Sequence, residues 1–394
     1  MNDMHSKDRS IAHMDLDAFF VSVECLRESS LKGKPLIIGG KSDRGVVASC
    51  SYEARSAGVH SAMPIRMAKR LCPDAIILRG DMEEYSKQSS LVTDVIASKA
   101  PLFEKASIDE FYLDLSGMDR YFGTYQWTIE LRKEIIKETG LPISFGLSVN
   151  KLVAKVSTDE AKPNGQIQIE KGKETSFLHP LAVKKLPGVG LVTQRQLTQM
   201  GIQTIKTLSD LPKELLISTF GQHGASLWDK SHAIDNRPVI PYREQKSMSK
   251  ESTLEKDTLR LDHIKAKIIA MTEQLAFELR NQKNLCGCIA IKIRYSDFNT
   301  YTKQKSITLT SLDRPLIQYA LELFDQLYQQ RKMIRLIGVR FSQLISGSPQ
   351  INLFDSQPRD IALIEEMDLI RNRFGKTAIQ RAGGIISKKP TNKR

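Results

Sequence analysis

Four carboxylates in two short segments are the residues whose types and spacing most favour catalysis in this sequence. Asp15 and Asp17 lie in the segment MDLDAFF, and Asp109 and Glu110 lie in the segment SIDEFYLDL. Both segments are otherwise apolar and strand-like, although a single carboxylate at a strand end is more often a cap or a surface residue. The segments are 94 residues apart (109 − 15), so the spacing alone leaves open whether they meet.

If the two segments do meet, their carboxylates need a cation. Unpaired carboxylates near a protein core repel one another because the dielectric constant there is low. Mg²⁺ relieves this repulsion, since it prefers oxygen ligands and often shares them with substrate phosphates. Two such ions about 3.5–4 Å apart can hold the attacking and leaving oxygens of a phosphoryl transfer. The pattern therefore favours metal-dependent chemistry on phosphate groups.

The elements that position these carboxylates alternate between strand and helix over about the first 170 residues. Strands are predicted from β-branched and aromatic content, and helices from the stretches between them. The predicted strands are 11–14, 111–115 and 143–149, the predicted helices are 80–100 and 125–138, and 34–51 is predicted as two short strands with a Gly-rich turn.

Residues 171–238 change character and are predicted as a small helical unit. Two glycine-containing hairpins, LPGVG at 186–190 and FGQHG at 220–224, separate its helices. Residues 239–248 carry proline and charge without a clear period, so they are predicted as a linker.

Residues 249–346 are predicted to fold in the order β-α-β-β-α-β. The predicted strands are 247–253, 286–295, 301–310 and 335–341, and the predicted helices are 261–279 and 315–330. In the second strand, isoleucines at every second position alternate with Lys292 and Arg294. One face can therefore pack on the helices while the other stays basic. A basic face suits phosphate contacts, and a solvated outer face is the simpler alternative.

The overall charge favours a polyanionic partner. The 394 residues include 58 Lys and Arg against 45 Asp and Glu, a net charge of +13. Nucleic acid is the usual partner of such a positive field, with a membrane surface or an acidic protein as alternatives. The sequence has no 18-residue apolar run and no apolar segment near its polar N-terminus, so neither a membrane span nor a secretory signal is expected.

Five sparse cysteines indicate a reducing cytoplasm rather than a disulfide framework. Cys286 and Cys288 are two residues apart without a histidine cluster, so a zinc site is not expected.

Seven segments together resemble the Y-family DNA polymerases of the DNA polymerase IV type. They occur in the order of that family over about residues 10–345, and the ordered set is far more specific than any one of them. The segments are MDLDAFFVSVE (14–24), KGKPLIIGG (32–40), SYEARSAGVHSAMP (51–64), SIDEFYLDLSG (107–117), GLSVNKLVAKVSTDEAKPNG (146–165), LPGVG (186–190) and RLIGVRFSQL (335–344).

The resemblance implies an α+β multidomain fold with the right-hand polymerase architecture. The implied parts are a ferredoxin-like palm (1–17 and 82–170), small fingers (18–81), a helix-hairpin-helix thumb (171–238), a linker (239–248), a β-α-β-β-α-β little finger that binds DNA (249–346) and a C-terminal tail (347–394).

The resemblance also implies the catalytic residues. Asp15, Asp109 and Glu110 are expected to be catalytic and to bind two Mg²⁺ ions, with the backbone carbonyl of Leu16 as a further metal ligand. Asp17 either supports this site or caps a turn.

The incoming dNTP is implied to lie beside these carboxylates. Phe20 resembles the steric gate that excludes a ribose 2′-OH. The small side chains of Ala48 and Ala62 leave room around the new base pair, which implies low fidelity. The sequence has no separate run of carboxylates that would indicate a proofreading nuclease, so none is expected. The remaining nucleotide-binding residues implied by the resemblance are Ala18, Phe19, Ser49, Tyr52, Arg55 and Lys162.

Primer-template DNA and a bacterial sliding clamp are the implied macromolecular partners. The glycines of the LPGVG hairpin let backbone N–H groups approach a DNA phosphate. The implied DNA-binding residues are Gly188, Gly190, Lys292, Arg294 and Arg340. The implied clamp-binding residues, in the segment QINLF, are Gln350, Leu353 and Phe354.

The position of QINLF departs from a terminal clamp motif, because about 40 residues follow it, including a predicted helix at 361–381. This tail either packs back on the enzyme or serves as a tether.

The leading interpretation is a monomeric, cytoplasmic, template-directed DNA polymerase for low-fidelity translesion synthesis. One alternative is a non-catalytic scaffold that binds DNA and recruits the clamp. Another is a different two-metal nucleotidyl enzyme, such as a cyclase, on a related palm. Incubation with one NTP and no DNA separates the last alternative, since a cyclase needs no primer.

Overall fold

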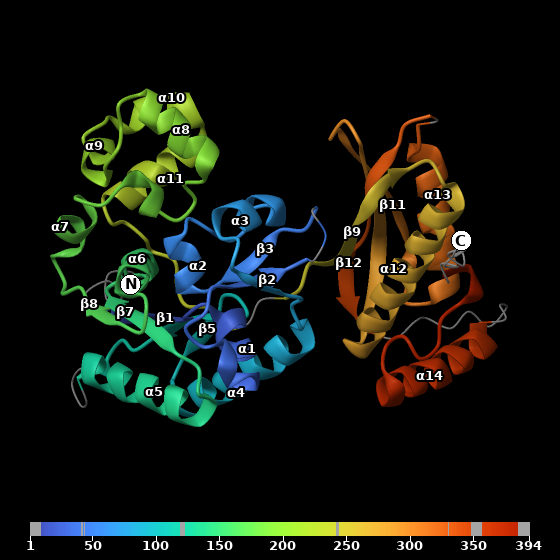
Figure 1. Ribbon diagram of the computed structural model, residues 1–394, viewed down its shortest axis with the longest axis horizontal. Helices are drawn as coiled ribbons and strands as arrows, with labels where there is room; N and C mark the ends of the chain where they lie inside the picture. Colours follow the sequence, from blue (N-terminus) through green and yellow to red (C-terminus); the bar gives the residue numbers. More distant parts are fainter. Residues whose placement is uncertain are drawn as a thin grey trace, which may run out of the picture. The chain divides into compact units, whose positions relative to one another are not determined.

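The computed structural model describes residues 9–40, 42, 44–118, 123–241, 244–329, 331–347 and 357–384. The chain forms two compact units, Met1–Arg243 and Glu244–Arg394, whose elements are shown in Figure 1. The boundary between the units lies inside the predicted linker. The finer division into palm, fingers, thumb and tail stays a prediction.

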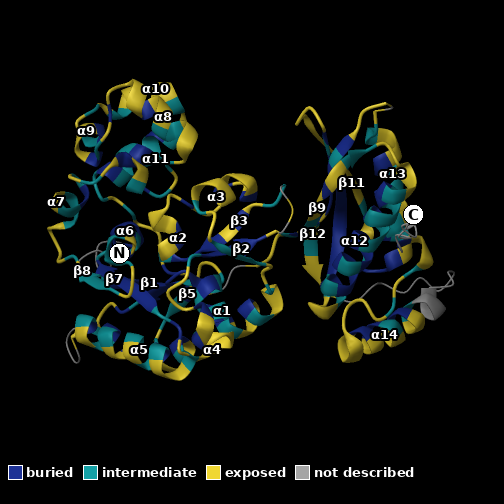
Figure 2. Ribbon diagram, in the orientation of Figure 1, coloured by how far each residue is buried: buried dark blue, intermediate teal, exposed yellow. Residues whose placement is uncertain are grey.

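The first unit is built on a five-stranded sheet in the order β5-β6-β1-β7-β8. All six residues of β1 are buried, because this central strand is covered on both faces. Helix α6 packs on β1 and β7, while α4 and α5 share a core with the sheet (Figure 2). The elements are β1 (Ile11–Leu16), α4 (Met82–Lys99), β5 (Phe103–Lys105), β6 (Glu110–Asp114), α5 (Thr124–Thr139), β7 (Ile143–Ser148), α6 (Lys151–Ala161) and β8 (Gln166–Gln168).

The segment between β1 and α4 contains a smaller sheet with the strand order β3-β2-β4. The two strands predicted within 34–51 are confirmed as the antiparallel pair β2 and β3. Ser51 caps the helix that follows β3 by accepting a hydrogen bond from the Ala54 N–H. The elements are α1 (Phe19–Arg27), a 3-10 turn (Ser29–Leu31), β2 (Leu36–Gly39), β3 (Val47–Cys50), α2 (Tyr52–Ser56), α3 (Ile65–Leu71) and β4 (Ile76–Leu78).

Five short helices and a 3-10 turn form the predicted helical region, around a core that includes Leu197, Leu216 and Leu227. The hairpin predicted at 220–224 is wrong in extent. The turn is confined to Gly221, whose φ of 62° is left-handed, and residues 222–224 already belong to the next helix. The elements are α7 (Glu174–Leu178), a 3-10 turn (Val183–Lys185), α8 (Leu191–Gln199), α9 (Ile205–Ser209), α10 (Lys213–Phe220) and α11 (Gln222–Ser231).

The second unit has the predicted order β-α-β-β-α-β. Its antiparallel sheet has the order β11-β10-β12-β9, and both helices share one hydrophobic core with it. The first strand runs five residues longer than predicted, to Thr258. The elements are β9 (Ser247–Thr258), α12 (Leu261–Asn281), β10 (Asn284–Tyr295), β11 (Thr300–Thr310), α13 (Asp313–Leu327) and β12 (Ile334–Ser346).

A C-terminal helix, α14 (Gln357–Phe374), belongs to the second unit and is followed by a 3-10 turn (Ala382–Gly384) that packs on α12. The helix predicted at 361–381 is therefore wrong at both ends. It stops at Phe374 because Gly375 adopts a left-handed φ of 99°. None of the described helices is long and apolar enough to span a bilayer.

Candidate active site

The pairing of β1 with β6 brings the two acidic segments together. Asp15 lies directly opposite Glu110 in this antiparallel ladder. One residue further along, the Leu16 N–H donates to the Asp109 carbonyl at 3.0 Å. The 94-residue separation in sequence is therefore bridged by neighbouring strands at the centre of the sheet.

Asp15 is a buried carboxylate whose partner is a lysine. Its side chain is 7% exposed, and Oδ1 lies 2.6 Å from the Lys162 ammonium. Burial raises the pKa of Asp15 to about 7, and Lys162 opposes this effect, while Glu110 and Asp109 add to it. An ammonium thus provides positive charge where several carboxylates meet. The oxygen donors here suit a hard divalent cation.

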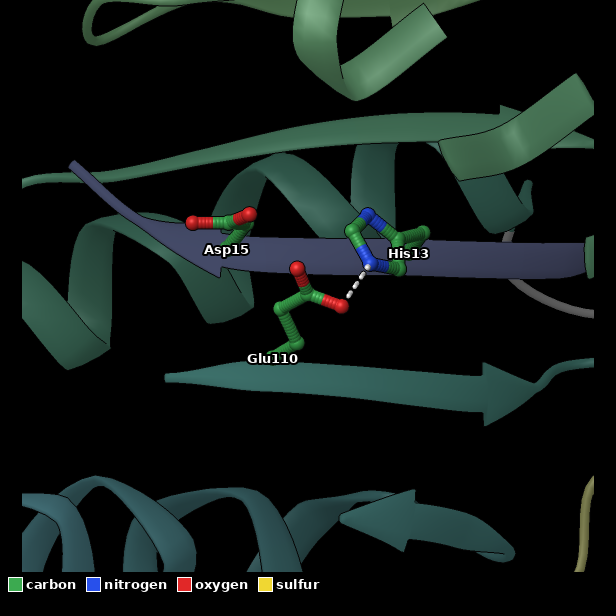
Figure 3. Close-up of side chains that lie close together, drawn as sticks. All are labelled: His13, Asp15 and Glu110. Atoms are coloured by element: carbon green, nitrogen blue, oxygen red, sulfur yellow. Dashed lines mark ion pairs between the residues drawn. The ribbon is translucent and has the colours of Figure 1, made fainter. Parts of the chain in front are cut away.

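Glu110 has the opposite electrostatic environment. Its Oε2 lies 3.6 Å from His13 Nε2, and its Oε1 lies 2.7 Å from Lys155 Nζ. Contacts with these two side chains lower the pKa of Glu110 to about 2, against the effect of partial burial. Complete burial lowers the pKa of His13 itself. The carboxylate is therefore ionised, and Figure 3 shows it on the same side of the sheet as Asp15 and His13.

His13 and Lys155 were not among the predicted site residues. His13 is two residues before Asp15, so the two side chains share one face of β1, and this spacing could have indicated it. Lys155 lies on α6, and no local pattern relates it to Glu110.

A cleft of about 140 Å³ brings together most of the predicted metal and nucleotide residues, and Glu110 and Tyr52 are not among those that line it. Asp109 lies on its wall and accepts a hydrogen bond from the Ser107 hydroxyl at 2.6 Å. The cleft is lined by Asp15, Leu16, Ala18, Phe19, Phe20, Ala48, Ser49, Arg55, Ser61, Asp109 and Lys162.

The start of α1 forms one side of this cleft. Ala18, its N-cap, has a left-handed φ of 43°, so the chain turns sharply between the carboxylates of β1 and the helix. Phe20 stacks on Tyr85 with ring centroids 4.3 Å apart and an interplanar angle of 12°. Tyr85 is fully buried and donates to Glu24 Oε1 at 2.7 Å. Tyr85 therefore holds the ring of Phe20 in place by stacking against it.

Tyr52 and Arg55, both on α2, stand beside each other. The guanidinium of Arg55 lies 5.0 Å from the centre of the Tyr52 ring, and its Nε donates to the Cys50 carbonyl at 3.2 Å. The Tyr52 hydroxyl reaches Asp17 Oδ1 at 3.4 Å. Of this pair, Arg55 lines the cleft.

Asp17 connects three segments around the cleft. Its carboxylate accepts hydrogen bonds from the Ser144 hydroxyl at 2.9 Å and from the Asn164 N–H at 2.8 Å, as well as from Tyr52. Of the two sequence interpretations, support of the site fits this arrangement, because the contacts fix the loop that carries Lys162.

Three segments of the chain match known protein families. Residues 14–159 match the impB/mucB/samB family, residues 245–353 match the C-terminal domain of that family, and residues 184–235 match the thumb domain of DNA polymerase-iota. A DNA polymerase IV from Dehalococcoides mccartyi is 38% identical over 376 residues, covering 94% of this chain and 96% of the relative.

Solved structures agree with these matches. A Y-family DNA polymerase chimera of Dbh and Dpo4 is 26% identical with a TM-score of 0.74, and the alignment covers 86% of this chain and 100% of the chimera. An insertion ternary complex of Dbh DNA polymerase is 27% identical with a TM-score of 0.62 and the same coverage. The chain belongs to the Y-family DNA polymerases of the DNA polymerase IV type.

The predicted DNA-binding residues of this polymerase lie in both units. In the first, Gly188 has a left-handed φ of 95° in the turn before α8, and Gly190 is the N-cap of α8. In the second, three basic side chains share one face of the sheet, because Arg340 lies opposite Ala290 on the same side as Lys292 and Arg294.

Two of these basic side chains have local partners. Lys292 pairs with Glu251 on β9, and Arg294 Nε donates to the Thr300 hydroxyl at 2.8 Å. Arg340 is exposed. Their DNA contacts stay predictions.

The predicted clamp-binding residues Gln350, Leu353 and Phe354 lie outside the described residues. Cys286 and Cys288 are buried free thiols on β10. Within the described ranges, the group of side chains able to hold a metal consists of His13, Asp15 and Glu110.

Proposed function

We propose that the cleft beside Asp15 is the site of template-directed DNA synthesis, in which a dNTP is added to a primer 3′-OH. The single observation that carries this assignment is the β1–β6 pairing, which places Glu110 opposite Asp15. Asp15 and Asp109 line the cleft together with Lys162 and Arg55. The chain is a translesion DNA polymerase by family, and this cleft is where its chemistry is assigned.

Asp15, Asp109, Glu110 and the Leu16 carbonyl are assigned as ligands of two Mg²⁺ ions. The Lys162 ammonium lies 2.6 Å from Asp15 Oδ1, which shows that this carboxylate attracts positive charge. When bound, Mg²⁺ supplies charge neutralisation for nucleotidyl transfer. The carboxylates hold their fixed positions because both strands lie in the centre of the sheet.

Basic and backbone groups around the cleft are assigned to the triphosphate. The planar guanidinium of Arg55 can donate to two phosphate oxygens at once. Lys162 can exchange its contact with Asp15 for a phosphate oxygen once the nucleotide is bound. Ser49 and Tyr52, together with the N–H groups of Ala18 and Phe19, complete the assigned nucleotide contacts.

Selectivity for the incoming nucleotide is assigned to Phe20 and Ala48, which also line the cleft. The supported ring of Phe20 acts as the gate against a ribose 2′-OH. Ala48 lines the cleft with a small side chain, which leaves space for distorted template bases and lowers shape discrimination. We assign low-fidelity synthesis to this open geometry.

Partners and location complete the proposal. The Dbh relative was solved as an insertion ternary complex, which supports primer-template DNA and dNTP as substrates of this chain. The net charge of +13 fits a DNA partner. A bacterial sliding clamp bound through residues 350–354, a monomeric state and a cytoplasmic location are proposed from the sequence.

Primer extension tests the metal assignment. The assay uses a labelled primer on an undamaged template, with the four dNTPs and Mg²⁺, with and without EDTA. Asp109→Ala is expected to abolish extension while leaving the dissociation constant for DNA within about threefold, because binding is dominated by phosphate contacts elsewhere.

The matched control is Asp94→Ala, which removes an exposed carboxylate from α4 of the same unit and should extend primers normally. Extension by purified Asp109→Ala would refute the assignment. Tight DNA binding without extension by the wild type would favour the non-catalytic scaffold instead.

A further inference from the structure

A carboxylate lies in the middle of the basic face of the second unit's sheet. Helices α12 and α13 share a core with one face of this sheet, and Lys292, Arg294 and Arg340 lie on the opposite face. Glu251 on β9 lies opposite Gly338 on β12, which in turn lies opposite Lys292 on β10, so these three residues form one row on the basic face. Among the paired positions of this face that the structure describes, Glu251 is the one carboxylate.

Gly338 provides the space that Glu251 needs to reach Lys292. Neighbouring strands are about 4.8 Å apart, so side chains from β9 and β10 can meet only by crossing β12. A Cβ added at Gly338 would lie 2.8 Å from Glu251 Cγ and 3.4 Å from its Cδ, so the side chain of Glu251 lies over this glycine. Gly338 is buried as a result, and the Lys292 ammonium pairs with the Glu251 carboxylate.

Stability gives little reason for a carboxylate at this position. The side chains of Lys292 and Glu251 are 36% and 38% exposed, and an ion pair with that much exposure stabilises a fold only slightly. The effect on a polyanion is more direct. The carboxylate takes up contact with the ammonium, and its own charge repels a phosphate group that approaches the same row.

We propose that Glu251 competes with DNA phosphate for Lys292 and thereby limits the affinity of this polymerase for DNA. The proposal rests on the proposed DNA contacts of the sheet face. When a duplex binds, the ammonium of Lys292 exchanges the Glu251 carboxylate for a phosphate oxygen, and the contact with Glu251 is lost. Because changes in affinity at one interface act mostly on the dissociation rate, Glu251 makes the enzyme release DNA sooner.

Removal of the competing charge should tighten DNA binding. Glu251→Gln keeps the length of the side chain and removes its charge. Fluorescence anisotropy with a labelled primer-template duplex measures the affinity of the full chain over a range of salt concentrations. We expect binding about two- to fivefold tighter at about 50 mM salt, and a slope of log affinity against log salt steeper by about one. Affinity and slope unchanged, or weaker binding, would refute the competition.

A matched variant controls for the change in net charge. Glu322 on α13 is also an exposed partner of a lysine, since its side chain is 39% exposed and lies 3.4 Å from Lys305. Glu322→Gln therefore makes the same change in charge away from the row of Lys292, and the affinity should stay within about 1.5-fold because salt screens exposed charges. Equal tightening by both variants would show an effect of net charge alone and would refute the proposal.

A double-mutant cycle tests whether Glu251 acts through Lys292. Lys292→Met should weaken DNA binding more in the Glu251→Gln background than in the wild type, because the ammonium is free for phosphate only when its competitor is absent. Two residues that act independently would show additive effects. Equal losses in the two backgrounds would therefore overturn the pairing as the cause.

The consequence for synthesis is the number of nucleotides added in one binding event. With a heparin trap that captures released enzyme, Glu251→Gln should give longer primer products than the wild type, and Glu322→Gln should not. Products of equal length from Glu251→Gln and the wild type would contradict the effect on release.

The role of Glu251 and the proposed function can fail separately. Arg294→Gln on the same face reports whether this face contacts DNA, and extension by the wild type reports polymerase activity. Weaker binding by Arg294→Gln without tighter binding by Glu251→Gln would refute the role of Glu251 and leave the DNA-binding face intact.

Discussion

Side chains at the site are held in place by contacts with side chains on other elements. Asp15 is held by Lys162, Glu110 by Lys155 and His13, and Phe20 by Tyr85. In each case a second side chain, on a different element, limits the movement of the first, and Asp15 and Phe20 line the cleft. Pre-organisation of this kind lowers the reorganisation that a reaction would otherwise require.

Ribonucleotide exclusion is the clearest property to test at this scale. Phe20→Val should admit rNTPs, with discrimination between dNTP and rNTP falling about 10–200-fold, the range for one shape-determining group. Tyr85→Leu should cause a smaller fall, because it removes the ring stacked behind Phe20. Single-nucleotide insertion kinetics measure both. Tyr85→Phe keeps the ring and is the control, and unchanged rejection by Phe20→Val would remove the gate assignment.

Individual elements depend on particular backbone and ionic features. The turn before α8 requires Gly188, whose φ of 95° lies in the left-handed region. Gly190, two residues later, has an ordinary φ of −83° and open space around it. The two glycines of one hairpin therefore have different structural roles.

This difference predicts unequal effects of alanine. Gly188→Ala should destabilise the first unit by about 1–2 kcal/mol, since an added Cβ is strained in this conformation. Gly190→Ala should change stability by less than about 0.5 kcal/mol. Urea unfolding followed by tryptophan fluorescence compares them, because both Trp127 and Trp228 lie in the first unit. DNA affinity measured in parallel tests the predicted phosphate contact. Equal stability of the two variants would contradict the role of the turn.

The C-terminal helix is attached through a buried network of charges. Arg371, 4% exposed, lies 3.2 Å from Asp368 and 3.6 Å from Glu273 on α12. Arg280 bonds both Asp368, at 2.6 Å, and the fully buried Asp313, at 2.7 Å. Residues 357–384 thus include side chains packed back on the second unit, as one of the two sequence alternatives stated.

Breaking this network should be severe. Arg371→Met removes one cation from the network and leaves its carboxylates with Arg280 and Arg381 alone. It should destabilise the second unit by about 1.5–3 kcal/mol, the range for losing a hydrogen bond to a charged group. Arg373→Met, on the exposed side of the same helix, is the matched control and should change stability by less than about 0.5 kcal/mol. Thermal unfolding of the full chain followed by circular dichroism compares the variants. Equal melting of the two would show that the network does not hold the helix.

At the scale of the whole molecule, the excess of positive charge governs association with DNA. Phosphate contacts release counterions, so the affinity should fall steeply with salt, by at least about tenfold between 50 and 200 mM. Arg294→Gln on the sheet face should reduce the slope of log affinity against log salt by about one. Arg314→Gln, an exposed arginine on α13, is the control. A slope unchanged by Arg294→Gln would remove this residue from the DNA contacts.

The sequence by itself determined the order of the elements and predicted which residues carry the chemistry, because carboxylate segments, strand alternation and glycine turns are local patterns. It predicted the β-α-β-β-α-β unit for the same reason. Only the tertiary structure decided that Asp15 faces Glu110, since strand register depends on pairing across 94 residues. The sequence likewise did not reveal the contacts of His13 with Thr158 and of Arg371 with Glu273. Each contact joins two elements that are distant in the chain and meet only in the folded protein, so no local pattern indicates it.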